Sequence, residues 1–279
     1  RAASKLAVPP ARAAPADLPI RPPMPLRVFI TGASSGIGAA LARHYAARGA
    51  TLGLVGRRRD ALDALARSLP GEHAVYRLDV AAPAALAEAA ADFNGRFGLP
   101  DVVIANAGVS VGTLTEEAGD LAAFERVLRT NVLGMVATFQ PFVAPMRERG
   151  AGRLVGIASV AGIRGLPGAG AYSASKAAVI AYLESLRVEL HGSGVKVVTI
   201  APGYIETPMT AVNDYPMPFM LPADEAARRF ARAIDAGTGY TVIPWQMGVV
   251  AKLLRMLPNP LFDKVLAGRP RKRRQSEMQ

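Results

Sequence analysis

Apolar runs of strand length alternate with longer stretches of helical periodicity along most of this chain. Seven runs stand out, at residues 27–30, 51–55, 74–78, 102–105, 154–158, 195–200 and 240–243. Six or seven such strands separated by helices predict a parallel sheet that helices cover on both faces. The pattern therefore predicts the α/β class, with a doubly wound parallel sheet in the Rossmann arrangement and no internal repeat.

The same pattern divides the chain. It predicts a single catalytic domain of Rossmann type at residues 25–246, an amphipathic helical extension at 247–268 and a basic tail at 269–279. Residues 1–24 are rich in Ala, Pro and Arg and lack apolar periodicity, so we expect a disordered or loosely ordered arm. Met24 looks like a natural start for the domain, and we expect the piece before it to be an over-called start or a dispensable arm.

Composition narrows the chemistry. The 279 residues are 51% hydrophobic, which is enough for one large core, and they include no cysteine and only three histidines. Disulfides and thiolate metal sites are excluded, and we expect no metal. Redox chemistry would therefore need a bound cofactor.

Charge is concentrated at the two ends. The net charge is +11, but residues 1–27 and 268–279 each carry five basic and one acidic side chains. We expect both flanks to be solvated tails, with 269–274 a solubilising or membrane-surface end, and no nucleic-acid partner. The arm lacks the apolar core of a signal peptide, and no run approaches the ~18 apolar residues of a membrane-spanning helix. We expect a soluble, cytoplasmic protein.

A glycine-rich turn follows the first strand. The segment 31–38 reads T-G-A-S-S-G-I-G and leads into a helical pattern. Glycines there permit a tight turn, close approach of backbone to a pyrophosphate and tight helix packing, and the helix start favours phosphate. Ligands of such sheets bind beyond the carboxyl ends of the strands. The turn therefore predicts a dinucleotide site, made by Gly32, Ser34, Ser35, Gly36, Ile37 and Gly38.

Arginines follow the second strand, where an NAD site usually has an acidic residue. Arginine at this place accommodates the 2′-phosphate of NADP(H), so Arg57 and Arg58 predict that coenzyme. The alternative is that they are only the basic first turn of an exposed helix.

The segment 159–176, SVAGIRGLPGAGAYSASK, carries the candidate catalytic groups. Tyr172 and Lys176 are one helical turn apart and share a face. An ammonium near a phenol favours the phenolate, so we expect a lowered pKa for Tyr172. Ser159 ends a predicted buried strand, where it could steady a carbonyl oxygen.

The glycine turn, in the spacing T-G-x-x-x-G-x-G, and the Tyr-x-x-x-Lys pair together resemble the short-chain dehydrogenase/reductase (SDR) family over about residues 26–245. The resemblance implies that Asn131 joins Ser159, Tyr172 and Lys176 as a catalytic residue, positioning a water. It implies that Tyr172 and Lys176 also bind the coenzyme. Further coenzyme contacts carried over by resemblance are Asp79, Val80, Asn106, Ala107, Gly108, Pro202, Gly203, Ile205 and Thr207.

The resemblance also implies a lid at residues 208–222, whose methionines and aromatic side chains favour a hydrophobic substrate. A contribution to the core is the alternative for this segment. The predicted function is reversible, NADP(H)-dependent reduction of a hydrophobic ketone or aldehyde. The alternatives are a nucleotide-sugar epimerase or dehydratase, and a sensor or scaffold that binds NADP(H) without turnover.

Partners follow from the helices. The resemblance implies a homodimer or homotetramer through residues 121–146 and 172–190, where Ala174, Ala178 and Ala181 give a small-residue face. The run 245–266 predicts a helix that packs on its own domain or on a partner subunit. Shallow attachment to an anionic bilayer is its alternative.

Overall fold

A seven-stranded parallel sheet forms the centre of the protein. The computed structural model describes residues 25–268, 271–274 and 276, so the predicted arm at 1–24 lies outside the described residues. The strand order is β3-β2-β1-β4-β5-β6-β7. The chain builds the sheet outward from β1 to β3 on one side and then, from β4 to β7, on the other side, as in a doubly wound sheet. The strands are β1 Arg27–Thr31, β2 Thr51–Gly56, β3 His73–Arg77, β4 Val102–Ala105, β5 Gly152–Ile157, β6 Val195–Pro202 and β7 Tyr240–Ile243.

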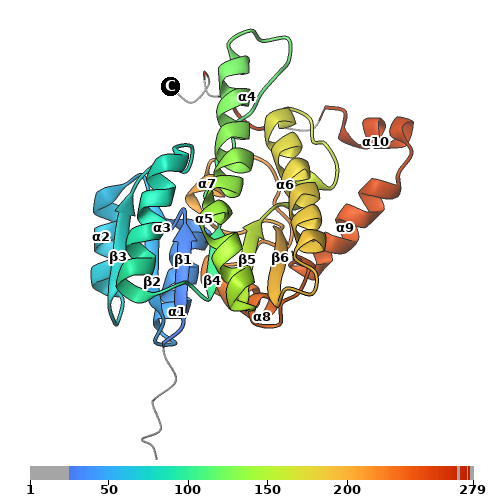
Figure 1. The fold of residues 1–279 in the computed structure, drawn as a ribbon. Helices are drawn as coiled ribbons and strands as arrows, with labels where there is room; N and C mark the ends of the chain where they lie inside the picture. Colours follow the sequence, from blue (N-terminus) through green and yellow to red (C-terminus); the bar gives the residue numbers. More distant parts are fainter. Residues whose placement is uncertain (1–24, 269–270, 275, 277–279) are drawn as a thin grey trace, which may run out of the picture.

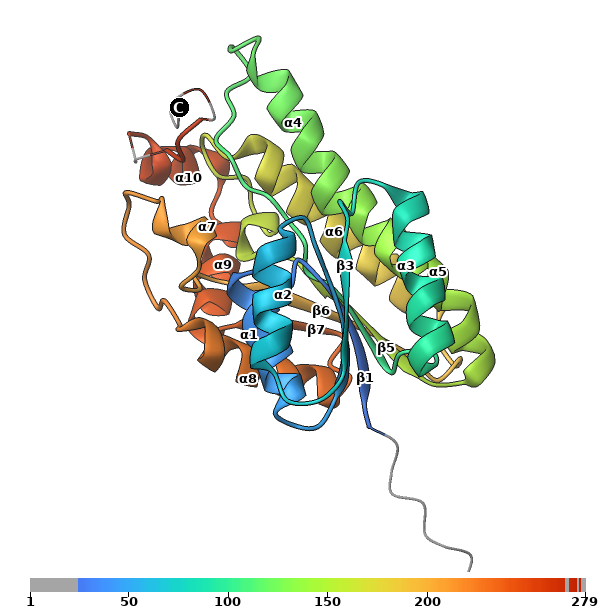
Figure 2. The same ribbon diagram turned by 90° about the vertical axis from the view of Figure 1, so that its left-hand side faces the viewer.

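Helices cover both faces of the sheet, as the two views show (Figures 1 and 2). α1, α2 and α8 pack on one face, while α3, α5 and α6 pack on the other. The helices are α1 Gly36–Ala46, α2 Arg59–Ser68, α3 Pro83–Phe97, α4 Asp120–Leu128, α5 Gly134–Arg149, α6 Gly170–Glu189, α7 Pro208–Ala211, α8 Ala223–Asp235, α9 Trp245–Met256 and α10 Asn259–Leu266. A π-helical turn at Arg129–Leu133 joins α4 to α5, and a 3₁₀ turn at Val160–Gly162 follows β5.

Each central strand contributes to two hydrophobic cores. In β1, Val28 and Ile30 are buried against α1 and α8, whereas Phe29 points to the other face and stacks near Phe93 of α3 with ring centroids 5.6 Å apart. Alternation is what a strand with both faces covered requires. The predicted α/β class and doubly wound sheet are confirmed, and strand ends differ from prediction by one or two residues.

The long helix expected at 121–146 is interrupted. The π-helical turn at Arg129–Leu133 contains one wide turn between two regular helices, and it buries Thr130 and Asn131. Such turns inside α-helices often occur at functional positions.

The C-terminal extension consists of two helices rather than one. α9 ends at Met256, and Pro258 precedes α10 because proline cannot continue the helix before it. Met247 and Ala251 are the buried positions of α9. Arg164 fixes the junction: its guanidinium donates to the Leu257 carbonyl (2.7 Å) and lies over the Phe262 ring at 3.7 Å from the centroid.

The prediction of a freely solvated basic tail is wrong for the described residues 271–274. The backbone N–H of Gly112 donates to the carbonyl of Arg273 (2.8 Å), and the side chain of Arg274 pairs with Glu117 and Asp120. Carboxylates on the body of the protein supply the counter-charge that the sequence pattern could not reveal, so this part of the tail packs against the domain.

None of the described helices is both long enough and apolar enough to cross a membrane.

Candidate active site

The glycine turn opens where β1 ends. Gly32 and Gly36 have φ of +69° and +53°, which side-chain-bearing residues rarely adopt. A Cβ on Gly32 would lie 2.8 Å from the Cα of Ala107, and one on Gly38 would lie 2.2 Å from the carbonyl oxygen of Gly32. The turn is therefore as tight as the sequence predicts, and it presents the start of α1 to the space above the sheet.

A clasp between β1 and β4 holds this turn, and the sequence analysis missed its main residue. The Thr31 hydroxyl accepts the backbone N–H of Asn106 (3.2 Å) and of Ala107 (3.3 Å). The Asn106 amide donates back to the carbonyls of Thr31 (3.1 Å) and Gly32 (3.2 Å). A buried threonine at the end of a strand was the available signal. The clasp joins the turns after both strands into one rigid unit.

The arginines after β2 lie beside the glycine turn. Arg58 donates to the Ser34 hydroxyl (3.2 Å) and carbonyl (3.1 Å), and Arg57 lies 3.9 Å from the carboxylate of Asp79. Asp79 also accepts the N–H of Ala81 (2.9 Å), a local turn that precedes α3. The guanidinium groups are exposed and face the cavity described below, which is where a 2′-phosphate would need them.

Ser159, Tyr172 and Lys176 converge from β5 and α6. Ser159 begins the 3₁₀ turn, where its Oγ accepts the N–H of Ala161 (3.1 Å). Lys176 is only 4% exposed, and its Nζ donates to the carbonyl of Ile157 (2.7 Å), 5.8 Å from the centroid of the Tyr172 ring. The three side chains therefore surround one point beyond the ends of the strands.

Burial sets the protonation of this group. Burial raises the pKa of the Tyr172 phenol, and the hydrogen bond with Ser159 lowers it by less. Burial brings the pKa of Lys176 down to about 8. The expected lowering of the Tyr172 pKa is therefore not found in this structure, because loss of hydration outweighs the groups that favour the phenolate. The phenol is held protonated at neutral pH.

Asn131 lies behind the site rather than on its surface. Its amide N–H groups donate to the Val109 carbonyl (3.0 Å) and the Ser175 hydroxyl (2.9 Å), and its oxygen accepts the N–H of Val109 (2.8 Å). A Cβ on Gly108 would lie 3.3 Å from the Asn131 oxygen and 3.8 Å from Lys176 Nζ. The Asn131 side chain thus fixes the segment after β4 next to Lys176.

The segment after β6 closes one side. Pro202, Gly203, Ile205 and Thr207 follow one another along the cavity wall. A Cβ on Gly203 would meet Met247 of α9 at 2.5 Å, and one on Gly36 would meet Thr207 at 3.0 Å. Thr207 caps α7 in a capping box with Thr210. The lid segment therefore begins against the glycine turn.

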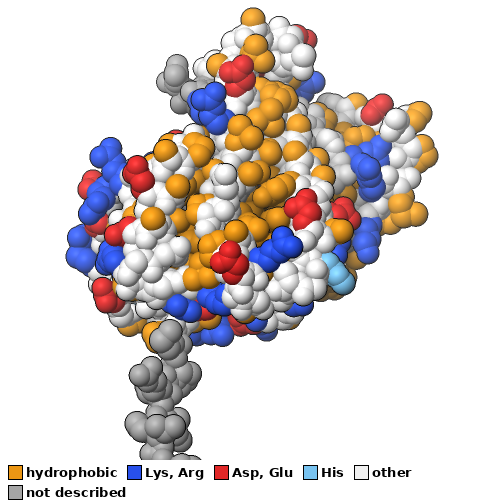
Figure 3. All heavy atoms as spheres, in the orientation of Figure 1, with side chains coloured by type: hydrophobic (Ala, Val, Ile, Leu, Met, Phe, Trp, Pro, Cys, Tyr) orange, Lys and Arg blue, Asp and Glu red, His pale blue; other side chains and the backbone are white. Residues whose placement is uncertain are grey.

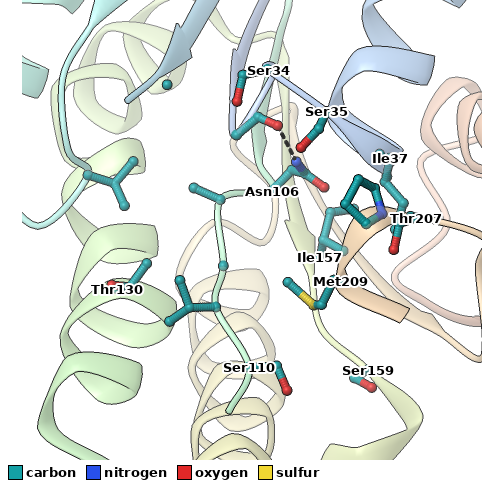
Figure 4. A pocket seen from close by; sticks show the side chains of 18 of the residues that line it. Ser34, Ser35, Ile37, Asn106, Ser110, Thr130, Ile157, Ser159, Thr207 and Met209 are labelled. Atoms are coloured by element: carbon teal, nitrogen blue, oxygen red, sulfur yellow. Dashed lines mark hydrogen bonds between the residues drawn. The ribbon is translucent and has the colours of Figure 1, made fainter. Parts of the chain in front are cut away.

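These parts line one cavity of about 790 Å³. Figure 4 shows Ser34 and Ser35 at one end and Ser110 and Ser159 at the other, with Thr207 and Met209 along one side. Every predicted site residue lines it except Gly38, which packs α1, and Asn131. Pro208, Met209 and Thr210, at the start of the predicted lid, also line it. Lining residues that the sequence analysis did not single out are Gly56, Leu78, Val109, Ser110, Val111, Arg126, Thr130, Ile157 and Ala158.

Comparison with known proteins agrees with this geometry. The family model for short chain dehydrogenases matches residues 27–216. An uncharacterized oxidoreductase of Myxococcus xanthus is 40% identical over 238 residues, which cover 84% of this chain and 94% of that protein. A 2-dehydro-3-deoxy-L-rhamnonate dehydrogenase (NAD(+)) of a Sphingomonas strain is 38% identical over 181 residues, covering 65% of this chain and 72% of that protein.

The crystal structure of levodione reductase superposes with a TM-score of 0.73 at 28% identity, covering 80% of this chain and 98% of that one. The family match extends over both the glycine turn and the Tyr-x-x-x-Lys segment, the two motifs that the fold brings onto one cavity. The chain belongs to the short-chain dehydrogenase family of oxidoreductases.

Proposed function

We propose that this protein is an NADP(H)-dependent oxidoreductase that reduces a hydrophobic ketone or aldehyde and, in reverse, oxidises the alcohol. One observation carries the proposal: Ser159, Tyr172 and Lys176 lie on the same cavity as the glycine turn, although the two motifs are far apart in the chain. The positive φ values of Gly32 and Gly36 give a tight turn on the cavity wall at the start of α1, which fits a dinucleotide whose pyrophosphate lies against that turn.

Residues Gly32, Ser34, Ser35, Gly36 and Ile37 would hold the pyrophosphate, and Pro202, Gly203, Ile205 and Thr207 would enclose the nicotinamide. When bound, NADPH supplies the hydride that the carbonyl carbon accepts. The Tyr172 hydroxyl donates its proton to the carbonyl oxygen, and the Ser159 hydroxyl donates a hydrogen bond to the same oxygen. A phenol that burial keeps protonated suits the proton donor of a reduction.

Lys176 and Asn131 act from behind the reacting groups. The Lys176 ammonium stabilises the phenolate that remains after proton transfer, and it would also reach the nicotinamide ribose. Because the Asn131 amide is engaged on Val109 and Ser175, we propose that it positions the wall beside Lys176 and that any water for proton resupply lies at the π-helical turn around it.

The coenzyme preference rests on Arg57 and Arg58. The Sphingomonas relative is named for NAD(+), so family membership leaves the choice open. Two arginines at the end of β2, with no acidic residue between Gly56 and Arg59, favour the additional phosphate of NADP(H).

The direct test is Tyr172→Phe, assayed by NADPH oxidation with ketones and aldehydes of increasing chain length. The variant should lose at least ~100-fold in kcat, because the proton donor is removed while the ring stays. Tyr182→Phe, on the same helix but away from the cavity lining, should keep wild-type rates. Undiminished turnover in Tyr172→Phe would refute the mechanism. NADPH binding without turnover of any carbonyl would favour the sensor or scaffold function instead.

We also propose a homodimer or homotetramer through the face formed by α4, α5 and α6. Hydrophobic side chains gather on this face in Figure 3. Leu133 is 61% exposed and Leu121 66%, and the small side chains of Ala174, Ala178 and Ala181 are exposed along α6. Apolar area of this kind is usually covered by a partner. Light scattering with Leu133→Glu, which should yield a monomer, tests it.

The α9–α10 ridge supports a weaker proposal of peripheral contact with an anionic bilayer. Trp245, Leu253 and Met256 are exposed, Met256 by 80%, and basic residues alternate with them along α9. Flotation with vesicles that contain anionic lipid, compared with neutral vesicles, tests this contact. Absence of binding to both would leave α9 and α10 as a surface for a partner subunit. A cytoplasmic location stays a prediction.

A further inference from the structure

The basic segment 271–274 lies across the substrate end of the cavity. Its backbone runs beside Gly112 of the segment after β4, with a parallel bridge between Gly112 and Arg274, and a Cβ on Gly168 would lie 2.9 Å from the Cβ of Arg271. Both neighbours flank cavity residues, since Gly112 follows Val111 and Gly168 precedes α6, which carries Tyr172. The segment therefore reaches the candidate active site from outside the domain.

Ion pairs hold the segment to two separate parts of the domain. Arg273 donates to Asp214 in the lid (2.8 Å from Nε), while Arg274 donates to Glu117 (2.8 Å) and to the largely buried Asp120 (2.9 Å) at the start of α4. An arginine that bridges two carboxylates is a strongly held contact. The residue between Arg271 and Arg273 is consequently fixed at the mouth of the cavity.

That residue, Lys272, points its charge at the catalytic tyrosine. Its Nζ lies 5.8 Å from the centroid of the Tyr172 ring, the same distance as Lys176 Nζ. The side chain is half-buried, and among the described residues no carboxylate lies within ion-pair distance of it. Burial accordingly lowers the pKa of Lys272 to about 8, which leaves it mainly cationic at neutral pH.

A second polar group without a partner lies at the same end of the cavity. The Ser110 hydroxyl is buried, lines the cavity, and has no hydrogen-bond partner among the described residues. Figure 4 places Ser110 with Ser159 at the end opposite Ser34 and Ser35. Buried polar groups are normally paired, so a hydroxyl and an ammonium that lack a partner among the described residues, both beside the reacting phenol, indicate a ligand group that pairs with them.

We propose that residues 271–274 form the outer wall of the substrate site, and that Lys272 binds an anionic group, such as a carboxylate, on the carbonyl substrate. This inference rests on the proposed function and specifies its substrate class as an apolar carbonyl compound with an acidic end. The Tyr172 ring offsets part of the cost of burying the ammonium but supplies no full negative charge. An anion on the substrate supplies it.

The test compares keto acids of increasing chain length with their methyl esters, using the full chain and NADPH. Lys272→Gln should reduce kcat/KM for the keto acids by ~10–100-fold, since a charge-assisted hydrogen bond contributes ~1.5–3 kcal/mol, and should change the esters by less than ~3-fold. Lys196→Gln removes the same charge from an exposed position of β6, away from the cavity lining, and should change neither.

Each other outcome overturns the inference. Equal loss on acids and esters would mean that Lys272 only tunes Tyr172 or supports the fold, and a wild-type preference for the esters would mean that no anion binds there. If none of these compounds is turned over, binding is measured instead. Saturated carboxylic acids should raise the melting temperature of the NADPH-loaded wild type but not of Lys272→Gln. Full activity of Tyr172→Phe would refute the proposed reduction. If Tyr172→Phe is inactive and Lys272→Gln shows no loss selective for the keto acids, the proposed reduction stands and only the role of Lys272 is refuted.

Discussion

The two ends of the cavity are built in different ways. The end proposed to bind the coenzyme consists of strand ends and the turns after them, held by the Thr31–Asn106 clasp and by glycines that only a close backbone approach explains. The substrate end is assembled from segments distant in sequence, which side-chain ion pairs hold together. A site whose shape depends on backbone contacts tolerates few substitutions. A site whose shape depends on side-chain ion pairs between distant segments can differ from one substrate to another.

The largest expected effect lies at the coenzyme end. Gly38→Ala would place a methyl group 2.2 Å from the Gly32 carbonyl, which the clasp prevents from moving. We expect NADPH affinity to fall by at least ~100-fold, equivalent to ~3 kcal/mol of overpacking. Gly95→Ala in α3 is the matched control, because no atom lies within 4 Å of its added Cβ. It should leave affinity unchanged and stabilise the protein by up to ~1 kcal/mol. Wild-type affinity in Gly38→Ala would contradict the rigid turn.

The second-largest effect is expected on the choice between NADPH and NADH. Replacing Arg57 and Arg58 together with alanine should raise the KM for NADPH by ~10–100-fold and leave that for NADH nearly unchanged, because only NADPH loses charge-assisted hydrogen bonds. Arg59→Ala removes a neighbouring arginine that pairs with Asp63 instead (2.8 Å) and should affect neither coenzyme. Equal weakening of both coenzymes would show that the arginines only support the turn.

Lys176, between the two ends, should affect stability in alkaline solution. Its pKa in the folded state is about 8, against 10.5 for a lysine in water, so its burial destabilises the fold while both states are protonated. That penalty is relieved as the pH rises from 8 toward 10.5, since the unfolded state then binds more protons. Relative to Lys176→Met, wild type should gain ~1.5 kcal/mol of unfolding free energy between pH 7.5 and 9.5.

Denaturant titration at the two pH values measures this gain. Lys196→Met, at an exposed position of β6, should keep the wild-type pH dependence. A parallel pH dependence for wild type and Lys176→Met would mean that the Lys176 ammonium is not desolvated.

The smallest effect is expected at the substrate end. Asp214→Asn removes the lid partner of Arg273, and because both side chains are largely exposed the pair contributes only ~0.2–1 kcal/mol. The KM for the carbonyl substrate should rise by up to ~3-fold at low salt and converge with wild type at high salt, while the KM for NADPH stays constant. Glu88→Gln, exposed on α3, is the control. A larger effect on NADPH than on the carbonyl would reverse the comparison between the two ends.

There is a physical reason why sequence reasoning could predict that the glycine turn and the arginines after β2 lie together on one cavity. Glycines at 32, 36 and 38 and the arginines after β2 are short-range patterns, and the parallel sheet brings the ends of all its strands to one edge. The protonation of Tyr172 was less accessible, because a pKa depends on desolvation by the whole fold, which residue spacing does not encode.

The packing of residues 271–274 escaped prediction because its contacts are long-range. A run of basic residues near the end of the chain is compatible with a solvated tail, and only the folded positions of Glu117, Asp120 and Asp214 show where residues 271–274 pack. The Ser110 hydroxyl and the Thr31 clasp are similar cases, since neither belongs to a periodic pattern. Motifs report local geometry, whereas the contacts of residues 271–274 depend on which distant segments meet.

Arg164 connects the surface ridge to the chemistry. It lies in the loop between Ser159 and Tyr172 and binds the carbonyl of Leu257 and the amide oxygen of Asn259 at the junction of α9 and α10. A bilayer or a second subunit that bound α9 and α10 would therefore be connected, through the Arg164 guanidinium, to the loop that precedes Tyr172, the proposed proton donor. One side chain thus joins the C-terminal extension to the loop before Tyr172, at a distance from any bound substrate.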